Sequence, residues 1–198
     1  MRVYRVSAAS NDYDSLVELD EQSRLSGLQP GSPLPPGWQP GRLAWYRGRR
    51  KVAADFWSYD HGAAYAVSPR VSNALDNASW CQLVPISTIP QNPRGEPMTP
   101  LEMTLLHLVQ VVDAVDRTAT GFLPLGSDLL DWDTPGAVVF KPEFVPLEGL
   151  FLQPDGDWRE VLCGEGRGES FRMVAERSGW TGLTFKLCYD ASVGRTVK

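Results

Sequence analysis

The chain is poor in the residues that support several common kinds of protein chemistry. Only three of its 198 residues are cysteines, Cys81, Cys163 and Cys188, and their odd number and wide spacing predict neither a disulfide framework nor a zinc site. Only two are histidines, His61 and His107, so few bases are present for nucleophilic catalysis. We therefore expect reduced core thiols, a core histidine at His107, and no catalytic residue, cofactor or metal site.

Several sequence motifs are missing as well. The chain has no G-x-S-x-G elbow, no G-x-G-x-x-G fingerprint and no P-loop lysine. No stretch approaches the ~18 apolar residues that are needed to cross a bilayer, and the opening residues lack the long apolar run of a signal peptide. These observations favour a cytoplasmic protein with no membrane partner.

Positive charge is also in short supply. The 24 acidic residues exceed the 19 basic ones, which gives a net charge of −5. A protein that binds nucleic acid through a basic surface has the opposite balance, so we expect no direct nucleic-acid partner. An acidic balance suits a basic protein partner instead.

Residues that interrupt regular structure are abundant. The chain contains 16 prolines, 18 glycines and 7 tryptophans, which predicts many turns anchored by large aromatic side chains. The stretch 26–41 alone has five prolines and four glycines around Trp38. We interpret it as a coil that Trp38 pins to the surface, with a binding loop as the alternative.

Two stretches repeat one plan, a short helix followed by a strand. In the first, Ser68 opens a helix predicted over 69–77, and a strand follows over 80–89. The second begins with a helix predicted over 169–178 and continues as a strand over 181–189. We expect both helices to pack on a sheet through large apolar side chains, namely Val71, Leu75, Phe171 and Val174. Trp180 and Phe185 are predicted to be core residues.

The remaining elements are mostly strands. They are predicted over 2–7, 42–46, 63–67, 137–141, 149–153 and 158–162. Residues 11–21 fit a short helix or an extended edge segment, and 163–170 is interpreted as a flexible approach to the last helix. Residues 101–115 fit a helix stripe and also a strand buried on both faces, and on pattern alone we predict a helix. The predicted class is α+β, a loop-rich single domain over 1–198 with an antiparallel or mixed sheet and two or three helices packed on it.

Two acidic stretches that contain a tryptophan are the candidate partner-binding sites. Their members are Asp128, Asp131, Trp132 and Asp133 in the first stretch and Asp155, Asp157 and Trp158 in the second. Carboxylates beside an exposed tryptophan can mimic phosphates and add an apolar anchor, which suits a basic cleft. The alternative is a solvated loop with Trp132 tucked inward. The first stretch lacks the glycine and the distal glutamate of a calcium loop, so we predict no metal there.

Four separate stretches resemble a known family. They are Asp55 with Phe56 and Trp57, Ala66 to Ser68 with the helix that follows to Leu75, the strand with Val84 and Pro85, and the closing FRMVAERSGWTGLTFK over 171–186. Over about residues 40–190 the chain is similar to the eleventh family of bacterial polymorphic-toxin immunity proteins. The resemblance divides the chain into 1–40, with a strand and the proline-rich loop, and a family-like core over 41–190.

The family pattern implies particular structural roles. A strand leads into a serine-capped helix, a central strand precedes an aspartate, here Asp113 or Asp116, and the last helix ends at a glycine that G-x-x-F follows. Gly179 and Gly182 fill the last two roles. The resemblance also favours a strand over 105–112. The loops at 26–41 and 90–100 depart from the pattern as insertions.

The resemblance implies a binding protein with no catalytic residues and no cofactor. Members of the family neutralise a cognate toxin that is delivered between neighbouring bacteria, as by type VI secretion, and is encoded by an adjacent gene. We therefore expect an immunity protein that occludes the toxin's active site, not an enzyme. Two alternatives stay open. One is a secretion-system adaptor or chaperone that binds an effector as cargo, and the other is an enzyme or small-ligand domain with a pocket around His61, Cys163 or Asp131.

Overall fold

In the part of the chain that the structure describes, two short α-helices are combined with many short strands. A computed structural model describes residues 1–9, 15–18, 31–38, 43–46, 54–59, 64–86, 88–90, 102–120, 130, 132, 134, 136–154 and 160–193. The strands are β1 (Arg2–Ala8), β2 (Ser15–Glu18), β3 (Leu43–Tyr46), β4 (Phe56–Tyr59), β5 (Ala64–Val67), β6 (Cys81–Ile86), β7 (Thr88–Pro90), β8 (Met103–Leu108), β9 (Phe151–Leu152), β10 (Val161–Glu165) and β11 (Leu183–Asp190). The helices are α1 (Pro69–Ala74), α2 (Phe171–Arg177) and the 3₁₀ helix η2 (Pro142–Phe144). The class is therefore mixed α+β, as predicted, and the described residues are mostly sheet.

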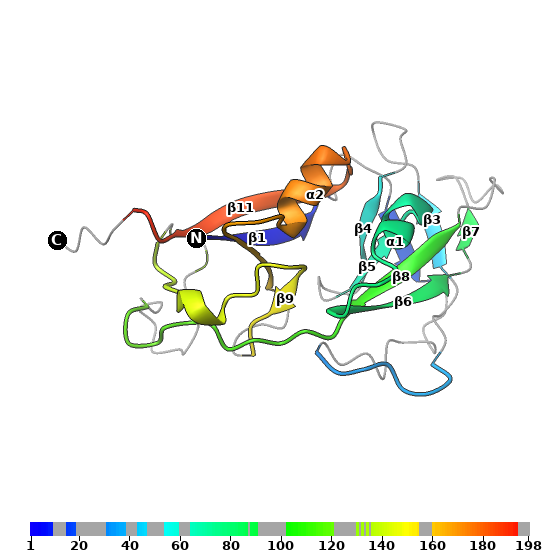
Figure 1. The fold of residues 1–198 in the computed structure, drawn as a ribbon. Coiled ribbons are helices and arrows are strands. Elements are labelled where there is room, and N and C mark those ends of the chain that lie inside the picture. Colours follow the sequence, from blue (N-terminus) through cyan, green and yellow to red (C-terminus); the bar gives the residue numbers. More distant parts are fainter. Residues whose placement is uncertain are drawn as a thin grey trace.

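The strands form three sheets (Figure 1). Strands from both ends of the chain make an antiparallel sheet in the order β11-β1-β10-β9, which we call the terminal sheet. A second antiparallel sheet in the order β4-β5-β8-β6 is the middle sheet. The small sheet β2-β3-β7 is mixed, because β3 pairs with β2 antiparallel and with β7 parallel. Segments far apart in the sequence are thus paired in every sheet.

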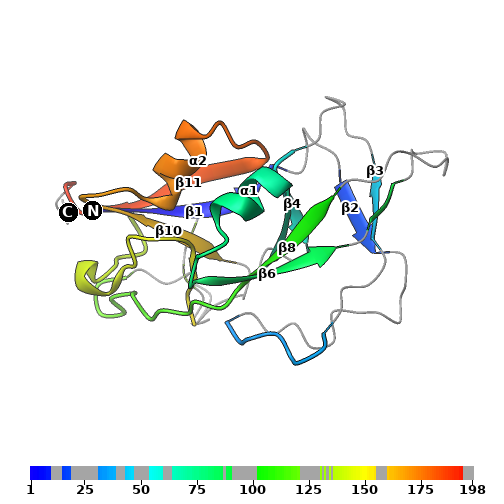
Figure 2. The same ribbon diagram turned by 45° about the vertical axis from the view of Figure 1, so that its right-hand side comes forward.

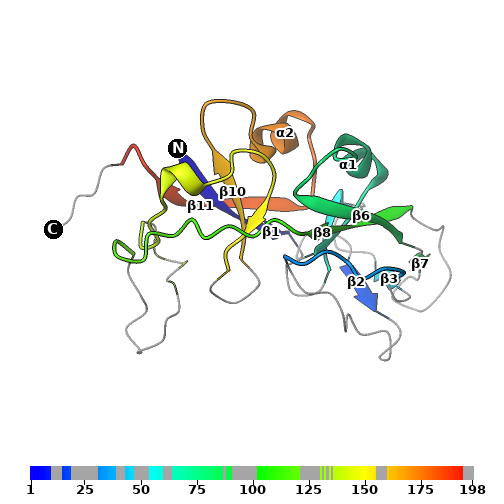
Figure 3. The same ribbon diagram turned by 60° about the horizontal axis from the view of Figure 1, so that its bottom comes forward.

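The two α-helices lie next to each other on one side of the terminal and middle sheets. Figures 1 to 3 show this from three directions, with α2 above β1 and β11 and α1 beside the middle sheet. Proline at its first position favours the start of α1, because the missing N–H has no partner to lose there. Both helices are short, so packing rather than helix propensity must stabilise them.

One cluster of buried side chains joins the two large sheets and both helices. It contains Val6 and Val161 from the terminal sheet and Phe56, Tyr65 and Leu106 from the middle sheet. The helices contribute side chains that were predicted to be buried: Val71 is 0%, Leu75 9% and Phe171 4% exposed, while Val174 is partly buried. Each such large side chain stabilises the fold by about 1.5–3 kcal/mol when buried. Val71 of α1, Leu75 directly after it and Phe171 of α2 pack in this cluster as predicted, whereas Val174 is not part of it.

Two further clusters cover the opposite faces. Val3, Leu162 and Cys188 of the terminal sheet pack with Phe140 and Phe151 in one of them. Ala64, Ala66 and Leu105 of the middle sheet pack with Trp57 in the other, against which Trp38 is also placed. Both large sheets are therefore covered on both faces.

Several strand predictions needed correction. Residues 137–141 do not form a strand, and Phe140 makes a single bridge to Val115 instead. The strand predicted over 158–162 begins, in the described residues, at Val161 and runs to Glu165, so the first part of 163–170 is strand rather than flexible. Pairing with β1 over five successive residues explains the extension, since Tyr4 and Arg2 lie opposite Cys163 and Glu165.

The ambiguous segments are now assigned. Within 101–115 the regular element is β8, a strand, so the helix suggested by periodicity is wrong. Within 11–21 the described residues form β2, which is extended. Helix α1 ends at Ala74, earlier than predicted. Trp180 and Phe185 are partly buried and pack against the cluster that joins the sheets, and both rings contact Phe171.

Candidate functional site

Most of the predicted partner-binding residues lie outside the described residues. These are Asp128, Asp131, Asp133, Asp155, Asp157 and Trp158. Trp132 is described and is partly buried, with its ring centroid 6.3 Å from that of Phe140. Its backbone N–H donates to the carbonyl oxygen of Leu130 at 3.2 Å. The contact with Phe140 favours the alternative that Trp132 is tucked inward, while a role in binding stays a prediction.

The structure brings together a different set of residues, which we call the Asp55 cluster: Asp55, Ser68, Arg70 and Thr181. The Asp55 side chain is 8% exposed and directly precedes β4. Its Oδ1 accepts from Ser68 Oγ at 2.7 Å and from Arg70 Nε at 2.5 Å. Its Oδ2 accepts from the Thr181 amide at 2.8 Å, from Thr181 Oγ1 at 2.9 Å and from an Arg70 terminal nitrogen. One carboxylate thus connects three stretches of chain.

Arg70 extends this cluster to the end of α2. Besides its two contacts with Asp55, its guanidinium donates to the carbonyl oxygens of Ser178 at 3.3 Å and Gly179 at 2.8 Å. The last carbonyls of a helix lack partners within the helix and attract positive charge. Arg70 therefore binds the first turn of α1 to the last turn of α2.

Hydrogen bonding determines the charge state of Asp55. Burial alone would raise the pKa of its carboxyl, but the hydrogen bonds from Arg70, Thr181 and Ser68 lower that pKa to about 2. The same contact with Asp55 raises the pKa of Arg70. The two groups are both ionised at neutral pH and form a paired, hydrogen-bonded contact of the kind that tolerates burial.

Ser68 does not have the role that the family pattern implies. It occupies the N-cap position of α1, yet its side chain makes no capping hydrogen bond. The hydroxyl donates to Asp55 instead, and the Ser68 amide donates to the Asp55 carbonyl at 3.0 Å. The true side-chain cap belongs to α2, where Ser170 Oγ accepts from the Met173 amide at 3.3 Å.

The backbone geometry explains why glycine is needed at both positions of the closing motif, Gly179 and Gly182. Gly179 has φ of +62° and ends α2: its amide donates to the Glu176 carbonyl, and the Trp180 amide donates to the Ala175 carbonyl. Gly182 has φ of +86°, and a Cβ there would lie 2.3 Å from the Phe56 carbonyl oxygen. Any side chain at Gly182 would push β11 away from β4.

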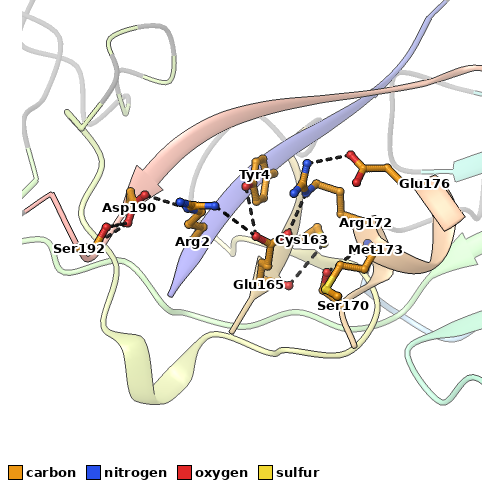
Figure 4. Close-up of polar contacts among 11 residues, drawn as sticks. Arg2, Tyr4, Cys163, Glu165, Ser170, Arg172, Met173, Glu176, Asp190 and Ser192 are labelled. Atoms are coloured by element: carbon orange, nitrogen blue, oxygen red, sulfur yellow. Dashed lines mark hydrogen bonds and ion pairs between the residues drawn. The ribbon is translucent and has the colours of Figure 1, made fainter. Parts of the chain in front are cut away.

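A second charged group, the terminal-sheet network, lies on the face of the terminal sheet that α2 covers (Figure 4). Its members are Arg2, Tyr4, Glu165, Arg172, Glu176 and Asp190. Glu165 accepts from Arg172 at 2.8 Å, and Arg2 donates to Asp190 at 2.8 Å. The Arg172 guanidinium also stands over the Tyr4 ring, 4.5 Å from its centroid. Acidic and basic groups alternate along this network, so its charges are largely compensated.

The family pattern places an aspartate, Asp113 or Asp116, after the central strand. In the structure Asp116 closes a turn, and Asp113 contacts another side chain. Both lie beyond the end of β8. Asp116 Oδ1 accepts from the Thr118 amide and hydroxyl and from the Ala119 amide, which closes a turn and lowers the pKa of Asp116. Asp113 accepts from Gln153 Nε2 at 3.0 Å.

The three cysteines and His107 are buried side chains of the core. All three cysteines are buried and free, and burial raises the pKa of Cys81, Cys163 and Cys188 to about 12 each, so the thiols are neutral at physiological pH. His107 is 1% exposed, as predicted for a core histidine. His61 lies outside the described residues. Among the residues that the structure describes, no three His, Cys, Asp or Glu side chains are grouped as a metal site would need.

No described helix is long and apolar enough to span a membrane.

Comparison with known proteins identifies no relative: no protein family matches the chain, and neither does any curated protein. The resemblance to the immunity family is carried by the motif residues alone. Sequence reasoning singled out Asp55 through that resemblance but missed Arg70 and Thr181 as its partners. Thr181 lies 126 residues from Asp55, and no local pattern indicates a contact over that separation.

Proposed function

We propose that the protein is an immunity protein of the polymorphic-toxin kind, which binds a cognate antibacterial toxin and occludes its active site. One observation supports this best: three of the four stretches that carry the family resemblance meet at Asp55. Two of these stretches are neighbours in the β4–β5 pair, and the third reaches Asp55 from 126 residues away. Motifs that define a shared core converge in this way, since each supplies a partner for the same buried carboxylate.

The fold positions these stretches as one structural unit. Phe56 follows Asp55 and packs against Trp180 and Phe171, with ring centroids 5.7 and 6.1 Å apart respectively. Gly182 allows β11 to approach the Phe56 carbonyl closely. Under this proposal the motif residues maintain the scaffold, and the partner contacts a different surface. A protein of this function acts in the cytoplasm of the producing cell, where the toxin would otherwise act.

The acidic stretches are the proposed contact surface for the toxin. An effector with a basic cleft is attracted by Asp128, Asp131 and Asp133 and by Asp155 and Asp157, and the net charge of −5 favours the same kind of partner. The partly buried Trp132 would contribute the exposed part of its ring. Trp158 is its counterpart in the second stretch.

Co-expression with the product of the adjacent gene tests the proposal. We expect that product to arrest growth alone, and the present protein to restore growth and to co-purify with it. Asp131→Lys with Asp133→Lys should slow association and flatten its salt dependence. Asp76→Lys with Glu102→Lys is the matched control, since it changes the charge equally at two exposed positions elsewhere. Co-purification without restored growth would support a cargo adaptor instead.

A further inference from the structure

His107 connects the middle sheet to the segment 31–38. It lies on β8, opposite Ala64 of β5 and Gln82 of β6. Its Nε2 lies 2.8 Å from the carbonyl oxygen of Ser32. Because a carbonyl oxygen only accepts hydrogen bonds, Nε2 carries the hydrogen, and Nδ1 of the neutral ring is then a bare acceptor.

A proton on the second ring nitrogen, Nδ1, would find no acceptor among the described residues. Nδ1 of His107 is buried, and no residue in the described part of the chain forms a hydrogen bond with it. A proton there would add a charge and a donor without an acceptor, in a side chain that is 1% exposed. Burial accordingly lowers the pKa of His107, against the hydrogen bond to Ser32, which acts to raise it.

Among the described residues, two other hydrogen bonds join this segment to the middle sheet. The Gly31 amide donates to the Leu108 carbonyl at 3.0 Å, and the Leu34 amide donates to Gln82 Oε1 at 2.7 Å. Trp38 packs on the apolar cluster of the same sheet face. A segment attached by a small number of hydrogen bonds opens locally at much lower cost than the whole fold.

The described residues on this face contain no other group that would titrate with His107. The described side chains on this face of the middle sheet are Trp57, Ala64, Ala66, Gln82, Val84, Ile86, Met103 and Leu105. None of them is ionisable between pH 5 and 8, and none of the residues at 31–38 carries an ionisable side chain. The second histidine, His61, lies outside the described residues, so a variant of His107 is needed to assign a change in this pH range to His107.

We propose that His107 is an acid-sensitive latch, which holds the segment 31–38 on the middle sheet while the imidazole is neutral and releases it when the ring is protonated. Release lets water solvate both ring nitrogens and frees Ser32, Leu34 and Trp38 from the sheet. The latch is independent of the proposed function. It would expose the outer face of the middle sheet under acidic conditions.

The direction of the pH effect follows from the pKa of His107 in the held and in the released state of the segment. In the released state His107 has its ordinary pKa of about 6.5, and in the held state that pKa is lower. The held state is therefore fully favoured above about pH 6.5 and loses stability as the pH falls below that value. One proton is involved, so the opening equilibrium constant rises at most about tenfold per pH unit.

Amide hydrogen exchange of the full chain between pH 5 and 8 tests the latch. The reporters are the Gly31 and Leu34 amides, corrected for intrinsic exchange, and the Val174 amide of α2 is the internal control. We expect reporter protection to fall below pH 6.5 by up to about tenfold per unit, while the control stays constant. His107→Gln retains a donor for Ser32 without a titrating group, so its reporter protection should not vary with pH.

Two results would overturn the latch. One is reporter protection that is independent of pH in the parent protein, and the other is a pH dependence that persists in His107→Gln. An NMR titration of the parent protein gives a second check that needs no variant. We expect His107 to be an Nε2–H tautomer that titrates below pH 6.5. A titration at or above that pH would contradict the latch.

Discussion

The Asp55 cluster and the terminal-sheet network contain similar groups and differ in what they connect. Asp55, whose side chain is 8% exposed, binds Thr181, and the segment of Thr181 shares no ladder with β4 among the described strands, whereas Asp190 binds Arg2, which the β1–β11 ladder already places opposite it. The pKa of each aspartate is lowered to about 2. Asp55 and Asp190 therefore have similar pKa values but different structural roles. Asp190, whose side chain is 12% exposed, accepts from the neighbouring Ser192 and from Arg2, so it joins no segments that the ladder does not already hold together.

Removing the two carboxylates should separate the roles most clearly. Asp55→Ala leaves the Ser68 hydroxyl and the Thr181 amide without their acceptor, and we expect a loss of about 3 kcal/mol in the free energy of unfolding. The estimate is at the low end for a broken buried pair, because Arg70 is 52% exposed at its side chain and stays hydrated. Asp190→Ala should cost much less. Urea denaturation of both variants measures the difference, and equal losses would show that Asp55 has no special role.

Acid tests the charge state of Asp55 directly. A carboxyl with a pKa of about 2 in the folded state and 3.8 in the unfolded state stabilises the fold fully above about pH 3.8, and this stabilisation is lost as the pH falls toward 2. Asp55→Asn removes the titrating group but keeps the shape of the side chain. We expect its free energy of unfolding to fall less steeply than that of the parent between pH 4 and pH 2. Parallel curves for parent and variant would contradict the assignment of the low pKa to Asp55.

The two N-cap serines offer a smaller, matched comparison. Ser68→Ala removes a hydrogen bond to a buried charge, for which a loss of about 1.5–3 kcal/mol is expected. Ser170→Ala removes an ordinary helix cap, for which about 1 kcal/mol is typical. Thermal unfolding of the two variants shows which of them loses more stability. A larger loss for Ser170→Ala would mean that Ser68 contributes mainly as a helix-start residue.

Substitution of Arg172 should cause the smallest loss in the free energy of unfolding. Its contacts with Glu165 and Glu176 lie at the surface of the terminal sheet, and the side chain keeps 24% exposure. Arg172→Lys preserves the charge but loses the planar guanidinium over Tyr4, so we expect a loss below about 1 kcal/mol that high salt reduces further. Unfolding at two ionic strengths measures it. A loss comparable to that of Asp55→Ala would place the network among the main stabilising contacts.

The sequence predicted the local elements of this fold better than its long-range contacts. Ser68, Pro69 and Gly179 are local signals, and both helices begin or end at them. The extent of β10 depends on pairing with β1, which no local pattern reveals, and the apolar residues 137–141 have only one bridge to a partner. For the candidate site, the family resemblance singled out Gly182, but the contact of Asp55 with Thr181 joins residues more than a hundred positions apart. The assignment of His107 to the core followed from its apolar neighbours and is confirmed.

The central claim is that Asp55 joins the start of β4 to the turn between α2 and β11. A double-mutant cycle with Asp55→Ala and Thr181→Val measures that connection directly, because it isolates the contact between the carboxylate and Thr181 Oγ1 at 2.9 Å. We predict a coupling free energy of at least about 1 kcal/mol, within the range of residues that share one hydrogen-bond network. Additive losses, with a coupling below about 0.3 kcal/mol, would contradict the claim that this carboxylate connects the two segments.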